Sequence, residues 1–148
     1  MGNRCFVPLE GGEIEIIHVP TPGGGGVEWR YTVPANYEIT LLSLRFELLT
    51  GAVPGVRKPG IVFENAFDPV LEQVWIPTSL SVPEGETYTL NFWLGSQRQV
   101  GVALTNSWFD ALPLIRWPAG TSWGSKTYNL KPGDLYPDIW QVVAKWRV

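Results

Sequence analysis

The sequence predicts an all-β protein, a jelly-roll-like sandwich or barrel, on three observations. Glycine and proline supply 16 and 13 of the 148 residues and interrupt the chain at short intervals. Between these interruptions apolar and polar residues alternate with a period of two, as in a strand with one buried face. No stretch has the length and the period of a good helix. Short strands separated by roughly 8–12 residues are typical of sandwiches and barrels.

The predicted strands follow one another along the chain. The first places Ile14, Ile16 and His18 on one face. Segment 65–74 is ambiguous and holds at most one helical turn. The other predicted strands cover residues 27–33, 42–48, 60–64, 71–76, 87–94, 100–104, 114–117 and 125–130, after a first strand at 13–19.

The last strand is predicted from residue 139 to the end of the chain. One face would carry Trp140, Val142, Ala144, Trp146 and Val148, and the other Gln141, Lys145 and Arg147. Chain ends are poorly ordered unless a sheet or a partner holds them. We therefore expect this strand to be built into the domain's own sheet, a neighbouring subunit, or both.

The connecting segments contain turn-forming residues, and the chain divides into residues 1–12, an N-terminal extended arm, and 13–148, a single β-sandwich domain. Proline followed by glycine sets the dihedral angles of tight turns. The arm contains Arg4, Phe6, Val7 and Leu9 and ends in two glycines. It either packs on a neighbouring subunit or forms an edge strand of the same sheet. The four glycines at 23–26 precede no helix, so they predict a mobile surface loop rather than a phosphate-binding loop.

Composition excludes several classes of function. The formal net charge of −3 gives no basic surface for nucleic acid. No apolar run is long enough to span a membrane, and no signal-peptide core is present, so we expect synthesis in the cytoplasm. The lone Cys5 cannot form an internal disulfide.

Catalytic chemistry is disfavoured. A hydrolase triad needs a histidine, and His18, the only one, lies in an alternating run that is typical of a structural side chain. Zinc requires clustered cysteine and histidine, and no calcium-loop motif accompanies the aspartates near turns. We expect no catalytic residue, no metal and no cofactor.

The chain is unusually aromatic, with eight Trp, six Phe and five Tyr. Trp108, Phe109 and Trp123 have loop-like neighbours and are the candidates for a partner interface, because aromatic residues are enriched in interface cores. The same residues could stack on sugar rings, as in carbohydrate-binding modules. They could also pack under their own loops.

Two segments carry a resemblance to a known family. The first is Val27-Glu28-Trp29-Arg30-Tyr31-Thr32-Val33-Pro34, followed by the apolar alternation from Leu42 to Leu48. The second comprises Leu112-Pro113, Trp117-Pro118-Ala119-Gly120, Lys131-Pro132-Gly133-Asp134 and the closing strand. Together they resemble the capsid decoration (auxiliary) proteins of tailed bacteriophages, including those of phages of thermophilic hosts.

This resemblance implies a structural virion protein without catalytic residues. It would form a homotrimer on the outside of the expanded head, bind the major capsid protein and stabilise the shell. The frequent loop prolines and the single Cys and Met also fit a thermostable particle. The alternatives are a carbohydrate-binding β-sandwich module and a receptor-binding or minor tail component.

Overall fold

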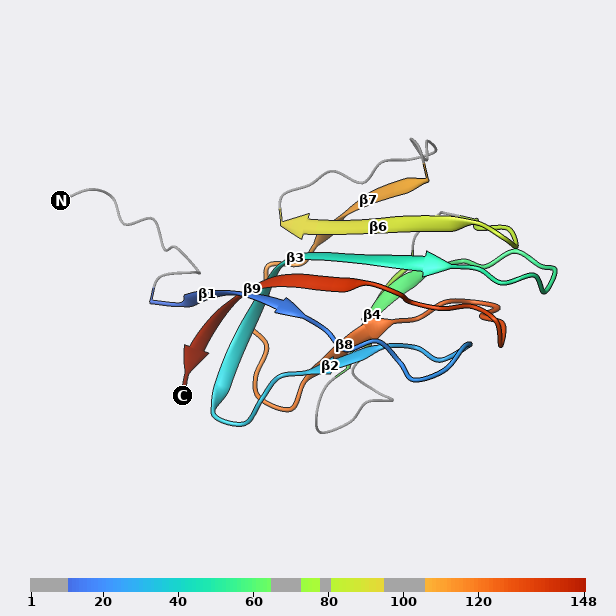
Figure 1. Cartoon of the computed structure of the whole chain (residues 1–148). Helices are drawn as coiled ribbons and strands as arrows, with labels where there is room; N and C mark the ends of the chain where they lie inside the picture. Colours follow the sequence, from blue (N-terminus) through green and yellow to red (C-terminus); the bar gives the residue numbers. More distant parts are fainter. Residues whose placement is uncertain (1–10, 65–72, 78–80, 95–105) are drawn as a thin grey trace.

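The computed structural model describes residues 11–64, 73–77, 81–94 and 106–148, and it is all-β over these ranges. Nine strands form two sheets, and the described residues contain no helix (Figure 1). The five-stranded sheet has the order β1 (Glu13–His18), β9 (Ile139–Arg147), β3 (Tyr37–Leu49), β6 (Thr87–Leu94) and β7 (Ser107–Leu112). The four-stranded sheet has the order β2 (Arg30–Thr32), β8 (Ser122–Ser125), β4 (Gly60–Glu64) and β5 (Gln73–Pro77).

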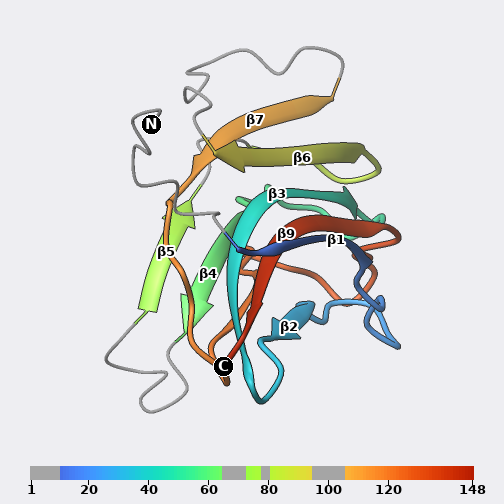
Figure 2. The ribbon, with the colours of Figure 1, turned by 90° about the vertical axis from the view of Figure 1, so that its left-hand side faces the viewer.

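The strand order is that of a jelly roll with one added strand. With β7 set aside, the two sheets run β1-β9-β3-β6 and β2-β8-β4-β5, and every neighbouring pair is antiparallel. This is the arrangement of a jelly roll, in which eight strands form two Greek keys. Strand β7 extends the edge beyond β6 and is parallel to it. Figure 2 shows the two sheets as separate layers, with β6 and β7 at one end. The predicted all-β sandwich is confirmed, while the predicted N-terminal arm lies almost wholly outside the described residues.

The core lies between the two sheets and is largely aromatic. Phe46 of β3 lies edge-on to Trp29, with ring centroids 5.4 Å apart. Phe63 of β4 packs on Trp123 of β8 at 5.9 Å, and all four side chains are buried. Each fully buried side chain of this size contributes about 1.5–3 kcal/mol or more. The aromatic excess of the sequence is therefore used mainly inside the domain.

A hydrogen bond joins the two sheets through this core. The indole Nε1 of Trp123 donates to Oε1 of Gln141 on β9 over 2.9 Å, and both residues are buried. Strand β9 lies between β1 and β3. The C-terminal strand is therefore built into the domain's own sheet, which was one of the predicted alternatives. The predicted polarity of its first half is wrong, because Gln141 faces the core and Trp140 is 41% exposed. Trp123 satisfies the side-chain carbonyl of Gln141, whereas the buried Nε2 of Gln141 has no hydrogen-bond partner among the described residues.

Two predicted loops are strands. Trp108 lies on β7 and Trp123 on β8. In β7 the buried face includes Asp110 and the outer face includes Phe109, which reverses the usual assignment of polar and apolar residues. In β8 a side chain at Gly124 would place its Cβ 2.0 Å from the carbonyl oxygen of Trp29, so only glycine fits there.

Other predicted strands differ in extent or are absent. The second predicted strand shortens to Arg30–Thr32, and β8 ends at Ser125, where a strand was predicted to begin. Residues 114–117 form no strand; Trp117 makes a single bridge to Ile39. Strand β3 begins before residue 42 and contains a β-bulge between Leu41 and Ser43. The predictions for residues 1–10, 65–72 and 100–104 lie outside the described residues.

A buried ion pair joins two connecting segments, the one between β3 and β4 and the one between β8 and β9. Nε and Nη2 of Arg57 donate to the two carboxylate oxygens of Asp134, each over 2.8 Å, and both side chains are fully buried. The backbone N–H groups of Gly51 and Lys131 donate to the same carboxylate over 2.9 and 2.8 Å. Burial alone would raise the pKa of Asp134, but these hydrogen bonds from Arg57, Gly51 and Lys131 hold it below its ordinary value.

Candidate interaction surface

The outer face of the five-stranded sheet carries two rows of side chains, which we call the outer rows. Strand register defines them, because residues directly opposite each other on neighbouring strands share a face. The first row is Ile16, Val142, Ser43, Trp93 and Ala111. The second row is His18, Trp140, Arg45, Asn91 and Phe109. All ten residues are exposed or half-buried, so the outer rows are accessible to solvent.

Strand β1 is the apolar end of this surface. In the described part of the chain it pairs with β9 only, and Ile14 and Ile16 are 60% and 68% exposed. The opposite side of the same strand carries Glu15, which lies 3.1 Å from Nζ of Lys145, and Ile17, which packs against the core. Exposed apolar edge strands are surfaces to which other chains attach, and proteins that need no such contact usually carry charge there. We call Ile14, Ile16 and the β1 backbone the β1 edge.

A groove crosses the middle of the sheet, between Trp140 and Trp93. It has a volume of about 230 Å³, and its lining includes Ser43, Arg45 and Asn91. Trp93 is 40% exposed and lies edge-on to Phe109, with ring centroids 5.2 Å apart. The surface therefore combines aromatic walls with a few polar side chains, which is the usual composition of a ligand site.

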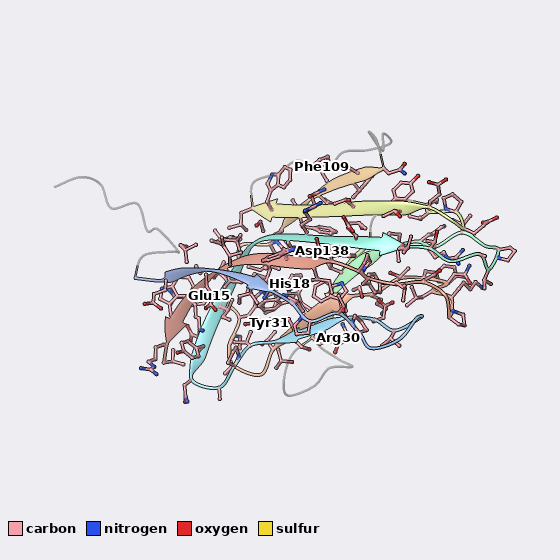
Figure 3. All side chains as sticks on the ribbon, in the orientation of Figure 1. Glu15, His18, Arg30, Tyr31, Phe109 and Asp138 are labelled. Carbon is pink, nitrogen blue, oxygen red and sulfur yellow. The ribbon has the colours of Figure 1, made fainter. Side chains whose placement is uncertain are left out.

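Contacts around Trp140 fix the orientation of its ring. Nε1 of Trp140 donates to Oδ1 of Asp138 over 2.8 Å. The His18 ring stacks on Trp140 with centroids 4.4 Å apart and an angle of 25° between the planes. Nε2 of His18 lies 3.5 Å from the same Asp138 oxygen. Figure 3 shows His18 and Asp138 next to each other, from β1 and from the residue just before β9. The aromatic wall of the groove is thus held in place before any ligand arrives.

The polar side chains of the groove come from β3 and β6. Arg45 lies across from Trp140 on one side and Asn91 on the other. Its Nη2 is 3.6 Å from Oε1 of Glu47, and Nδ2 of Asn91 donates to the carbonyl oxygen of Trp108 over 3.3 Å. Among the described residues, Arg45 is the only charged one that lines the groove. The groove therefore carries a local positive charge on a chain whose net charge is negative.

The interface candidates from the sequence fall in three different places. Trp108 and Trp123 are 2% and 0% exposed, so their assignment to loops was wrong and they present no surface to a partner. Both were drawn into the core because β7 and β8 turn these side chains inward. Phe109 lies in the outer rows beside Trp93. The arm candidates, Arg4, Phe6, Val7 and Leu9, lie outside the described residues.

Sequence reasoning missed Trp93 and Trp140 as surface residues. Both follow the alternation of a predicted strand, and an alternating tryptophan is ordinarily assigned to the buried face. A signal was present in each case: Phe92 beside Trp93, and Ile139 beside Trp140, are equally apolar neighbours that could occupy the core instead. Both neighbours are fully buried. Alternation alone could not choose between the two faces.

The described residues contain no group of three or more His, Cys, Asp or Glu side chains placed to hold a metal ion. Within the same residues, no helix is long and apolar enough to cross a membrane. Comparison of the chain with protein-family models, with curated proteins and with solved structures found no match.

Proposed function

We propose that this chain is a structural virion protein without catalytic activity, which decorates the outside of a phage head as a homotrimer and stabilises the major capsid protein shell. The observation that carries the proposal is the β1 edge, where two isoleucines on the outer side of the strand are more than half exposed. The jelly-roll strand order supports it by analogy, because this architecture occurs in viral capsid and lectin domains.

The size of the β1 edge explains why a trimer would be needed. Burying a whole isoleucine contributes about 1.5–3 kcal/mol. Scaled by exposures of 60% and 68%, the two side chains supply roughly 2–4 kcal/mol per subunit. Association costs an estimated 4–15 kcal/mol. One edge is too small to offset this cost, whereas three edges on one trimer act together through their high effective concentration.

The proposal is tested by sedimentation with expanded heads assembled from the major capsid protein of the same genome. We expect the wild-type chain to sediment with the heads. The double variant Ile14→Glu/Ile16→Glu places carboxylates at the contact and should lose binding. Tyr128→Glu is the matched control, because Tyr128 is 69% exposed but lies away from β1. Failure of the wild-type chain to bind, or equal binding by the double variant, would contradict the proposal.

The arm provides a second test. Deletion of residues 1–11 should leave the domain folded, because β1, the first of the described strands, begins at Glu13. We expect the deletion to abolish binding to heads, since Arg4, Phe6, Val7 and Leu9 are proposed to contact a neighbouring subunit or the capsid. Unchanged binding would remove the arm from the contact while leaving the β1 edge in place.

A further inference from the structure

We propose that the groove between Trp140 and Trp93 binds an acidic saccharide, with a pyranose ring packed on Trp140 and its carboxylate paired with Arg45. The groove shares Ile16 with the β1 edge, but this proposal rests on Trp140 and Arg45, which the decoration proposal does not use. The two proposals can therefore fail separately.

The aromatic wall suits a sugar ring. A pyranose has an apolar face of C–H bonds and a rim of hydroxyl groups, and it packs flat against an aromatic side chain. Trp140 is 41% exposed, lines the groove and is oriented by Asp138. His18 stacks on the ring, so the ligand meets the ring surface that faces the groove. A ring held in this way loses little conformational entropy on binding, which favours affinity.

The charge in the groove selects an acid. In the described part of the chain, no other charged residue than Arg45 lines it, and a guanidinium binds a carboxylate through two parallel hydrogen bonds. Its contact with Glu47 spans 3.6 Å between partly exposed side chains. That distance exceeds a hydrogen bond, and exposed pairs of this kind contribute about 0–1 kcal/mol or nothing measurable. A ligand carboxylate can therefore replace Glu47 at Arg45.

The remaining polar groups and the size of the groove suit part of a glycan. Ser43 and Asn91 lie beside Arg45 and can bond with hydroxyl groups. The volume of about 230 Å³ is below the roughly 300–1,000 Å³ of sites that enclose drug-sized ligands. An open groove of this size fits one or two rings of a longer chain that crosses the sheet. Nucleic acid is disfavoured, because one arginine on a chain of net charge −3 cannot neutralise several phosphates.

Binding is tested with two pairs of probes by calorimetry: 3′-sialyllactose with lactose, and trigalacturonate with maltotriose. We expect at least one acidic probe to bind at least about tenfold more tightly than its neutral counterpart. Arg45→Ala should weaken that binding at least about tenfold. Arg45→Lys keeps the positive charge but loses the two parallel hydrogen bonds of the guanidinium, so its affinity should lie between those of the wild-type chain and Arg45→Ala. Arg30→Ala is the matched control, because Arg30 is also a strand arginine beside a glutamate, on the other sheet (Figure 3).

A second readout locates the ligand independently of affinity. The indole N–H resonance of Trp140, identified from its loss in Trp140→Phe, should shift when the acidic probe is added. Loss of the shift in Arg45→Ala would support the site. Three results would overturn the proposal: no binding by either acidic probe at millimolar concentration, equal binding of acidic and neutral probes, or binding and shifts that survive in Arg45→Ala.

Discussion

Replacement of Asp134 by asparagine should destabilise the fold more than any comparable change to a surface carboxylate. Asp134 accepts four hydrogen bonds of 2.8–2.9 Å, two of them from Arg57, and neither side chain is exposed. Asparagine keeps one oxygen, turns an NH₂ group toward donors and leaves the guanidinium charge buried without a partner. Breaking a buried pair on one side costs about 3–5 kcal/mol.

Urea unfolding measures this loss directly. The free energy of unfolding should fall by about 3–5 kcal/mol, and Tm by about 6–20 °C, since 1 kcal/mol corresponds to roughly 2–4 °C in a domain of this size. Glu38→Gln is the control: it removes a partly exposed carboxylate 3.6 Å from Arg116, and we expect a change of about 1 kcal/mol or less. A loss in Asp134→Asn no larger than in Glu38→Gln would refute the reasoning.

A double variant separates the ion pair from the rest of the site. Arg57→Met leaves a buried carboxylate that still has the N–H donors of Gly51 and Lys131. In Arg57→Met/Asp134→Asn the uncompensated charge is gone, so the double variant should lose less than the sum of the two single losses. Additive losses would mean that the two side chains do not stabilise the fold as a pair.

Three further outcomes follow from the structure. The first concerns pH. Because the pKa of Asp134 is lowered in the folded state, its carboxylate should stabilise the fold fully above the ordinary carboxyl pKa near 4, and this stabilisation should be lost as pH falls through the lowered pKa. Unfolding measured at decreasing pH should show this loss in the wild-type chain and not in Asp134→Asn. Trp123→Phe should reduce the free energy of unfolding by about 1–3 kcal/mol, because the buried carbonyl of Gln141 loses its donor; a loss below 0.5 kcal/mol in urea, roughly the scatter of surface changes, would contradict it. Ile14→Thr and Ile16→Thr should change the unfolding free energy of the isolated subunit by about 0.5 kcal/mol or less, since both side chains are more than half exposed; larger losses at low protein concentration would show that these side chains support the core.

The fold class was predictable because two signals agreed along most of the chain. Strands β4 (Gly60–Glu64) and β6 (Thr87–Leu94) have the predicted bounds. β4 is a short continuous apolar run with Ile61, Val62 and Phe63 all buried, whereas β6 alternates and follows a turn at Gly85. Strand β7 was not predictable in this way. Its inward face includes Asp110 and its outward face Phe109, so the pattern of one buried and one exposed face is reversed at its centre. Pairing with β6, which is distant in sequence, decides its structure.

The candidate surface was less predictable than the fold, because period-two alternation does not say which face is buried. On β9, Gln141 lies inward only because Trp123 from the other sheet donates to it. That choice turns Trp140 outward, where Asp138 and His18 fix it. Contacts between segments more than a hundred residues apart in the chain, such as His18 and Trp140, leave no mark in local sequence patterns.

The mass of the purified chain in solution, measured by light scattering over a range of concentrations, tests the central claim most directly. The account predicts a stable species of about three times the 16.5 kDa chain mass. Ile14→Glu/Ile16→Glu, measured in parallel, would show whether the β1 edge contributes to that trimer or serves only the capsid. A wild-type chain that stays monomeric at every concentration would contradict the proposed trimeric decoration protein and leave the groove as the remaining functional site.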